Sequence, residues 1–169
     1  MDLPWLQISG AIAGGLFGGF SGFIANNLQE RAHRREMQRN VACALIGEID
    51  GLCRHLGSRL ATLASDLEAI KQQRAYTYHH FRGERDYMLV YRSLGKEVGL
   101  LPSPLPRDLV CWFTALAVCL EREHELHQLA LQRNPEWLDY AVDAAAAQRD
   151  AFNELLELAR PLHERLLSL

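Results

Sequence analysis

The residues best suited to chemistry are pairs of an arginine and a histidine with four residues between them. Arg122 and His127 form one such pair, Arg74 and His79 form another, and Arg74 precedes His80 at nearly the same spacing. A histidine can act as a general acid or base near neutral pH, and an arginine can bind a phosphate through parallel hydrogen bonds. Arg122 and His127 are therefore the candidate catalytic residues of a ribonuclease. Because arginine is abundant in this chain, such pairs also arise by chance, and we expect a protein that is not an enzyme.

A metal site is the second chemistry that this segment could support. Glu121 and His124 form the Glu-x-x-His pattern of carboxylate-bridged helical bundles. The other such pair, Glu30 and His33, lies far away in the sequence among arginines, where it cannot share a site in the core. We therefore expect no metal and no cofactor, and we interpret residues 121–127 as a charged, solvated helix face.

Charge and cysteine spacing argue against two further classes of function, nucleic-acid binding and zinc binding. The net charge of −3 argues against a general nucleic-acid-binding protein. The cysteines lack the CxxC spacing of zinc sites and lie among apolar residues. We expect all four to be reduced and buried: Cys43, Cys53, Cys111 and Cys119.

The first predicted helix begins with an uncharged N-terminal stretch. Pro4 to Ala25 gives 22 residues without a charge, and a helix needs roughly 20 to cross a bilayer. Small residues recur four apart within the stretch, which places them on one helix face and permits close packing between membrane helices. The predicted oligomerisation face consists of Gly10, Gly14, Gly15, Gly18, Gly19 and Gly22. We predict a transmembrane helix with a glycine zipper over residues 1–27.

Charges flank this stretch almost entirely on one side. Only Asp2 precedes it, whereas arginines follow it at Arg31, Arg34, Arg35 and Arg39. The positive-inside rule then places the C-terminal part in the cytoplasm, and Trp5 suits the opposite interface. We predict a single-pass protein of the bacterial inner membrane whose arginines contact the lipid bilayer at its headgroups. A signal peptide and a buried soluble helix are the alternatives, but the first needs a basic n-region and a cleavage site, and the second would carry the cost of six glycines.

Residues 28–169 are predicted to form a cytoplasmic helical bundle, so the expected fold class is all-α. Apolar residues from Leu45 to Ile70 recur at three- and four-residue steps, which predicts that the helix of the span continues to about Arg74. Pro161 is expected to kink or end the last helix. The further helices are expected over 84–94, 104–132 and 135–168, with a proline-rich turn over 99–106.

Three features of this bundle leave alternatives open. Glu48 and Asp50 either line the vestibule of a ring or face solvent. The apolar run from Leu109 to Leu120 forms a buried core helix or dips into the membrane. The basic and aromatic segment 74–85 binds a nucleotide by stacking or packs against the bundle.

The overall plan is one glycine-rich span, an arginine-rich junction and a compact helical domain. It resembles small single-span membrane effectors and accessory proteins of bacterial antiviral systems, in particular those of type VI CRISPR loci, which join a span to a divergent HEPN-like domain. Arg122 and His127 resemble the arginine–histidine motif of HEPN domains. The resemblance implies a homo-oligomer that forms a pore, with a cytoplasmic domain that responds to a protein or nucleic-acid trigger. A membrane-anchored adaptor is the main alternative function, and a HEPN-like ribonuclease is the other.

Overall fold

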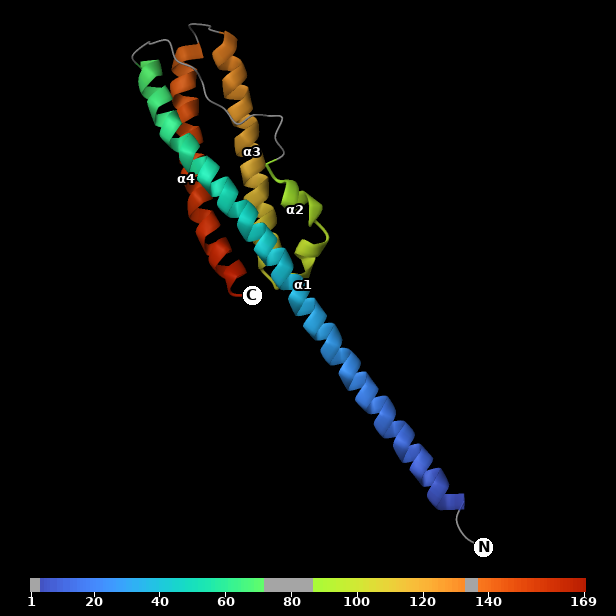
Figure 1. Ribbon diagram of the computed structural model, residues 1–169. Coiled ribbons are helices and arrows are strands. Elements are labelled where there is room, and N and C mark those ends of the chain that lie inside the picture. The colour runs from blue at the N-terminus through green and yellow to red at the C-terminus, as the bar shows by residue number, and fades with distance from the viewer. Residues whose placement is uncertain (1–3, 72–86, 133–136) are drawn as a thin grey trace. The chain divides into compact units, whose positions relative to one another are not determined.

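The computed structural model describes residues 4–71, 87–132 and 137–169, and it consists of helices and turns there (Figure 1). The side chains at 4–24, 67, 69–71, 127–132, 137–139 and 141 are not among the described ones. The elements are α1 (Pro4–Lys71), α2 (Leu89–Ser93), the 3-10 helix η1 (Glu97–Leu100), α3 (Leu105–Gln132) and α4 (Trp137–Leu167). No strand occurs in the described ranges, which confirms the prediction of an all-α fold.

The chain divides into two compact units, residues 1–40 and residues 41–169. In the first unit α1 is helical, and its side chains from residue 25 to residue 40 are largely exposed. The predicted glycine face and Trp5 come before residue 25, so their side chains lie outside the described residues. In the part of the chain that the structure describes, no helix combines the length and the apolar character needed to cross a membrane.

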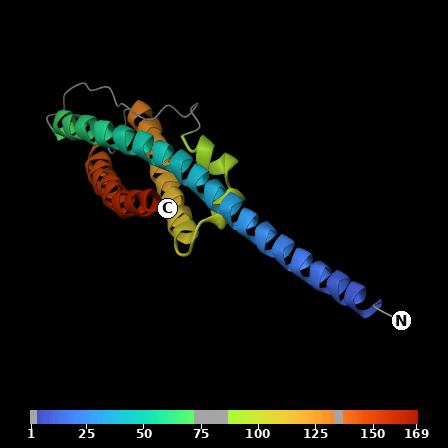
Figure 2. The same ribbon diagram turned by 60° about the horizontal axis from the view of Figure 1, so that its bottom comes forward.

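The core of the second unit lies between α1, α3 and α4 (Figures 1 and 2). The apolar face predicted for α1 is buried at Leu45, Ile49, Leu52, Leu56 and Leu63, while Leu60 is half-buried. The main core also contains the buried side chains of Leu109, Trp112, Phe113 and Leu116 from α3 and of Phe152, Leu155, Leu162 and Leu166 from α4. Leu63 instead packs in a smaller cluster with Ala145 of α4. Each such side chain contributes roughly 1.5–3 kcal/mol when it leaves water, so this core is the main reason that the three helices associate.

Helices α3 and α4 are antiparallel, as the short connection between them requires. At one end Arg165 Nη1 of α4 lies 2.7 Å from Asp108 Oδ2 of α3. Farther along α3 and α4, Gln148 Nε2 of α4 donates a hydrogen bond of 2.7 Å to the carbonyl oxygen of Cys119 in α3. Residue numbers thus fall on α4 as they rise on α3, so α4 is antiparallel to α3, and α1 runs in the direction of α3 (Figure 1).

The short helix α2 is held against the core by one carboxylate and one aromatic ring. Glu48 of α1 accepts hydrogen bonds from the backbone N–H groups of Val90 at 2.7 Å and Tyr91 at 2.8 Å. The Tyr91 ring stacks on Phe113 with a centroid separation of 4.0 Å. The helix predicted over 84–94 is therefore present but shorter, and residues 84–86 lie outside the described ranges.

The predicted turn over 99–106 overlaps a short element that the sequence pattern did not reveal. The 3-10 helix η1 ends at Leu100, and the buried side chains of Val98 and Leu101 hold this segment to the core. The peptide bond between Ser103 and Pro104 is cis, and α3 begins one residue later. The prolines thus lie before the helix interior, as predicted.

Of the two outcomes predicted at Pro161, a kink or the end of the helix, the second does not occur in α4. The helix continues through Pro161 to Leu167, and it follows a curved path in Figure 2. Arg165 Nε donates a hydrogen bond of 3.2 Å to the Pro161 carbonyl oxygen, one turn earlier. The predicted start of this helix at residue 135 lies outside the described residues.

The expectation that all four cysteines are buried is wrong for two of them. Cys119 is buried and Cys53 is half-buried, but Cys43 and Cys111 are exposed, and all four are free thiols. The apolar neighbours in the sequence misled the prediction, because a helix buries only the face that meets its neighbours.

Candidate functional site

The candidate catalytic residues belong to the second half of α3. Arg122 is exposed, as are Glu121 and His124, whereas the side chain of His127 lies outside the described residues. The Arg122–His127 pair therefore stays a prediction. Among the described residues, no group of three or more histidine, cysteine, aspartate and glutamate side chains could hold a metal ion.

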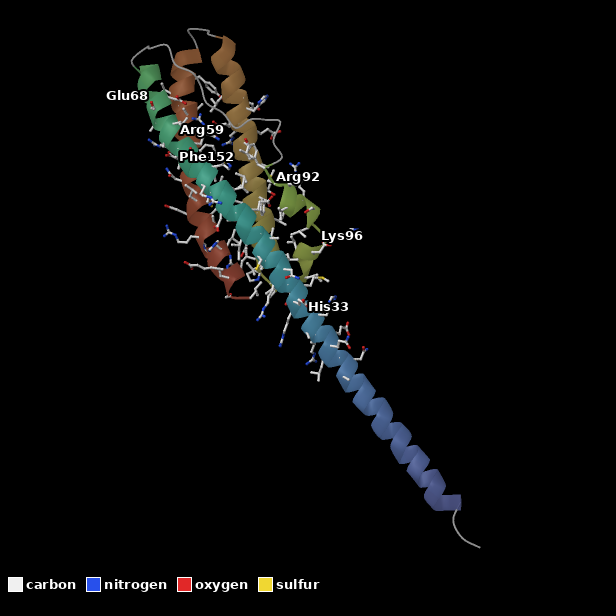
Figure 3. The ribbon with its side chains drawn as sticks, in the orientation of Figure 1. His33, Arg59, Glu68, Arg92, Lys96 and Phe152 are labelled. Atoms are coloured by element: carbon white, nitrogen blue, oxygen red, sulfur yellow. The ribbon has the colours of Figure 1, made fainter. Side chains whose placement is uncertain are left out.

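Glu123 points into the bundle, which corrects the interpretation of residues 121–127 as a wholly solvated face. It is 0% exposed, and its Oε1 accepts a hydrogen bond from Arg59 Nε of α1. Arg59, labelled in Figure 3, is only 6% exposed, and its Nη1 lies 3.1 Å from Asp66 Oδ2. We call Arg59, Asp66, Glu123 and Gln148 the buried ionic cluster.

The uncharged side chains of Thr62 and Gln148 add hydrogen bonds to the charged residues of this cluster. The Thr62 hydroxyl accepts a bond of 2.9 Å from Arg59 Nη1 and donates one of 2.9 Å to the Arg59 carbonyl oxygen. Gln148 Nε2 lies 3.3 Å from Glu123 Oε2, in addition to its bond to the Cys119 carbonyl. Since Arg59 comes from α1, Glu123 from α3 and Gln148 from α4, the buried ionic cluster joins the three long helices.

The local sequence of α1 explains why charge enters the core. Leu56, Arg59, Leu63 and Asp66 follow one another at steps of three and four residues, and all four are buried. The periodicity that buries the leucines therefore buries the charged residues between them. A charged residue at a position of the apolar face is the signal that could have revealed this cluster from the sequence.

Burial dominates the electrostatics of the cluster. Loss of hydration raises the pKa of the Glu123 carboxyl above its usual value, and the Asp66 carboxylate acts in the same direction. The Arg59 guanidinium and the hydrogen bonds from Arg59 and Gln148 oppose this rise without cancelling it. Burial also raises the pKa of the neighbouring Cys119 thiol.

The buried ionic cluster can hold helices in register, but it offers no reactive group to a substrate. Each of its members is nearly or fully removed from solvent. A buried ion pair adds little net stability compared with apolar packing, but loss of one partner is costly, so the pairing favours one arrangement of the helices. We interpret the cluster as the feature that sets how α1 packs on α3 and α4.

The two acidic residues that were candidates for a vestibule have separate roles in the bundle. Glu48 is half-buried and accepts the two backbone bonds of α2 described above, so it is part of the fold. Asp50 is exposed and lies 3.2 Å from His163 Nε2 of α4 through its Oδ1. In this bundle, then, Glu48 does not simply face solvent.

The predicted membrane-interface arginines lie on α1 in the first unit, in the same stretch as His33 (Figure 3). All four are exposed: Arg31, Arg34, Arg35 and Arg39. Their guanidinium groups can therefore bind anionic phosphates at a surface.

Comparison with known proteins adds no family to this description. The chain matches no protein-family model, no curated protein and no solved structure.

Proposed function

We propose that this chain is a homo-oligomeric single-span protein of the bacterial inner membrane, and that it acts as a pore-forming or membrane-perturbing effector or accessory of a defence system. Residues 4–25 span the bilayer, and the glycine face packs neighbouring spans together. The helical bundle lies in the cytoplasm, where a protein or nucleic acid triggers the assembly. The protein is not an enzyme.

The observation that carries this proposal is that α1 is helical from Pro4 through the glycine-rich stretch to Lys71. In water, each glycine in a helix interior costs about 1 kcal/mol relative to alanine. In lipid, by contrast, a helix is favoured because it satisfies every backbone hydrogen bond within the segment. An uncharged, glycine-rich helix is therefore better suited to lipid than to water.

Two further features support the proposal. The exposed arginines follow directly after the uncharged stretch, where they can bind lipid phosphates on the cytoplasmic side. The charged residues of the buried ionic cluster are engaged with one another inside the bundle, which is typical of a structural core. Such a bundle suits a collar or a docking domain.

The test is the mass of the full-length protein in detergent, measured by light scattering. The variant Gly14→Leu/Gly18→Leu fills the proposed packing face. Gly47→Leu/Gly57→Leu is the matched control, because both glycines are exposed on α1 with open space around them. We expect a discrete oligomer in the wild type and the control, and a smaller species in the first variant.

Two companion measurements separate the alternatives. Dye release from anionic vesicles should require the wild-type glycine face if the oligomer perturbs membranes. A monomer or dimer that ignores the glycine substitutions would instead favour the membrane-anchored adaptor. Extraction from membranes by alkaline carbonate without detergent would contradict the span itself, and RNA cleavage that His127→Ala abolishes would favour the ribonuclease.

A further inference from the structure

The outward face of α3 is uncharged over its middle turns although it lies on the surface of the bundle. Val110 is 47% exposed and Val118 is 43% exposed, and Cys111 and Thr114 are also exposed. This face belongs to the apolar run 109–120, for which a buried core helix and a segment that dips into the membrane are the two predictions. Only the inward half of that run is used by the core.

The residues of this face are arranged symmetrically about Thr114. Val110 lies four residues before it and Val118 four residues after it, while Arg107 lies seven before and Glu121 seven after. Residues four and seven apart lie on the same side of a helix, so the five form one stripe. Arg107 and Glu121 are both exposed. They lie at the two ends of the stripe and carry opposite charges.

We propose that a second copy of this chain docks on this stripe, with the two α3 helices antiparallel about a twofold axis at Thr114. Residues equally far from the axis then meet, so Val110 packs against the partner subunit's Val118. Arg107 faces the partner subunit's Glu121, and the symmetry forms each of these contacts twice. The uncharged middle of one stripe packs against the uncharged middle of the other. At each end of the contact, an arginine of one copy faces a glutamate of the other.

The charges select this arrangement over a parallel pair. In a parallel pair the two copies of Arg107 would meet, as would the two copies of Glu121, and like charges across an interface are unfavourable. The antiparallel contact is isologous and closes at two copies, with the two bundles running in opposite directions. It is therefore a different contact from the glycine-face packing of the proposed function, and it does not depend on a membrane span.

Charge reversal tests the contact. The parent is the full-length Gly14→Leu/Gly18→Leu protein in detergent, in which glycine-face packing is removed, and the dimer dissociation constant is measured by analytical ultracentrifugation. Arg107→Glu and Glu121→Arg should each weaken the dimer at least about tenfold, because each places two like-charge pairs across the axis. The double variant should recover to within about threefold of the parent. Arg54→Glu, an exposed position on α1, is the control and should change nothing.

Crosslinking tests the position of the axis. In a Cys43→Ser/Cys111→Ser background, Thr114→Cys places two thiols at the twofold, where mild oxidation should produce a disulfide-linked dimer. Wild-type Cys111 lies three residues from the axis, so its two copies would be offset by roughly 9 Å along the helices and should not crosslink. Ser58→Cys, exposed on α1, is the second control in the same background.

The outcomes separate this proposal from the proposed function. A monomeric parent at every concentration would overturn the α3 contact, as would a dimer that ignores both charge reversals and fails to crosslink through Thr114→Cys. Neither result would bear on the glycine-face oligomer, which is tested by the light-scattering comparison of Gly14→Leu/Gly18→Leu with its control. Crosslinking through Thr114→Cys with charge-swap recovery would support the α3 contact even if the glycine substitutions had no effect on mass.

Discussion

At the scale of single residues, the buried ionic cluster depends on Arg59, which contacts both Glu123 and Asp66. We expect Arg59→Met to lower the free energy of unfolding by about 3–5 kcal/mol, because it leaves buried carboxylates without their cation. Denaturant unfolding followed by tryptophan fluorescence measures this change. The matched control is Arg149→Met, since Arg149 is exposed and pairs with an exposed Asp150, so its loss should cost less than about 1 kcal/mol. Equal losses in the two variants would contradict the role of Arg59.

Glu123 should give the bundle a pH dependence of unusual sign. Because its pKa is raised in the native state from the ordinary value of 4.5, the native protein holds this proton more tightly than the unfolded chain. The resulting stability is fully present below the unfolded pKa and is lost as the pH rises through the native pKa. The difference in unfolding free energy between wild type and Glu123→Gln should therefore fall as the pH rises above the ordinary value of about 4.5. A difference that grows over this range would mean that Arg59 outweighs burial.

At the scale of elements, α2 is too short to be stable alone, and Glu48 supplies its N-terminal hydrogen bonds. We expect Glu48→Ala to expose the Val90 and Tyr91 amides to hydrogen exchange and to destabilise the bundle by about 0.5–2 kcal/mol, as loss of a helix cap does. Asp50→Ala is the control, because Asp50 lies on the same helix and contacts α4 instead. Unchanged exchange at the two amides after Glu48→Ala would show that the stacking of Tyr91 suffices.

In α3, one apolar run supplies both a buried side that packs in the core and an exposed side. Its inward positions carry Trp112 and Phe113, and its outward positions carry Val110 and Val118. Residues 109–120 carry no charge on either side of the helix, so this run looks like a fully buried helix in the sequence. Burial on one side only leaves the other side available for a partner.

At the scale of the whole molecule, residues 41–169 form a compact unit of their own. We expect this fragment, expressed without the first unit, to keep its helical circular dichroism and to unfold cooperatively, because the core residues that the structure describes all lie at Val41 or later in the chain. The same fragment should retain the α3 contact and lack association through the glycine face. A fragment without a cooperative transition would show that the first unit contributes to the fold of the second.

Local patterns in the sequence predicted the all-α fold class and most of the helices. Spacings of three and four residues predicted the α1 face from Leu45 to Leu63, and the prolines before Leu105 predicted where α3 could begin. These features were readable because helical periodicity and proline geometry act between near neighbours in the chain. The uncharged glycine-rich stretch was readable for the same reason, and its membrane role stays a prediction.

Which polar residues belong to the core became clear from the packing of the helices against one another. Glu123 looked like one charge of a solvated face until α1 brought Arg59 to it across 64 residues of sequence. Cys111 and Cys119 have similar apolar surroundings in the sequence, yet one is exposed and the other buried. Whether a residue is buried depends on which helix packs against it, and that depends on contacts between distant segments that no local pattern records.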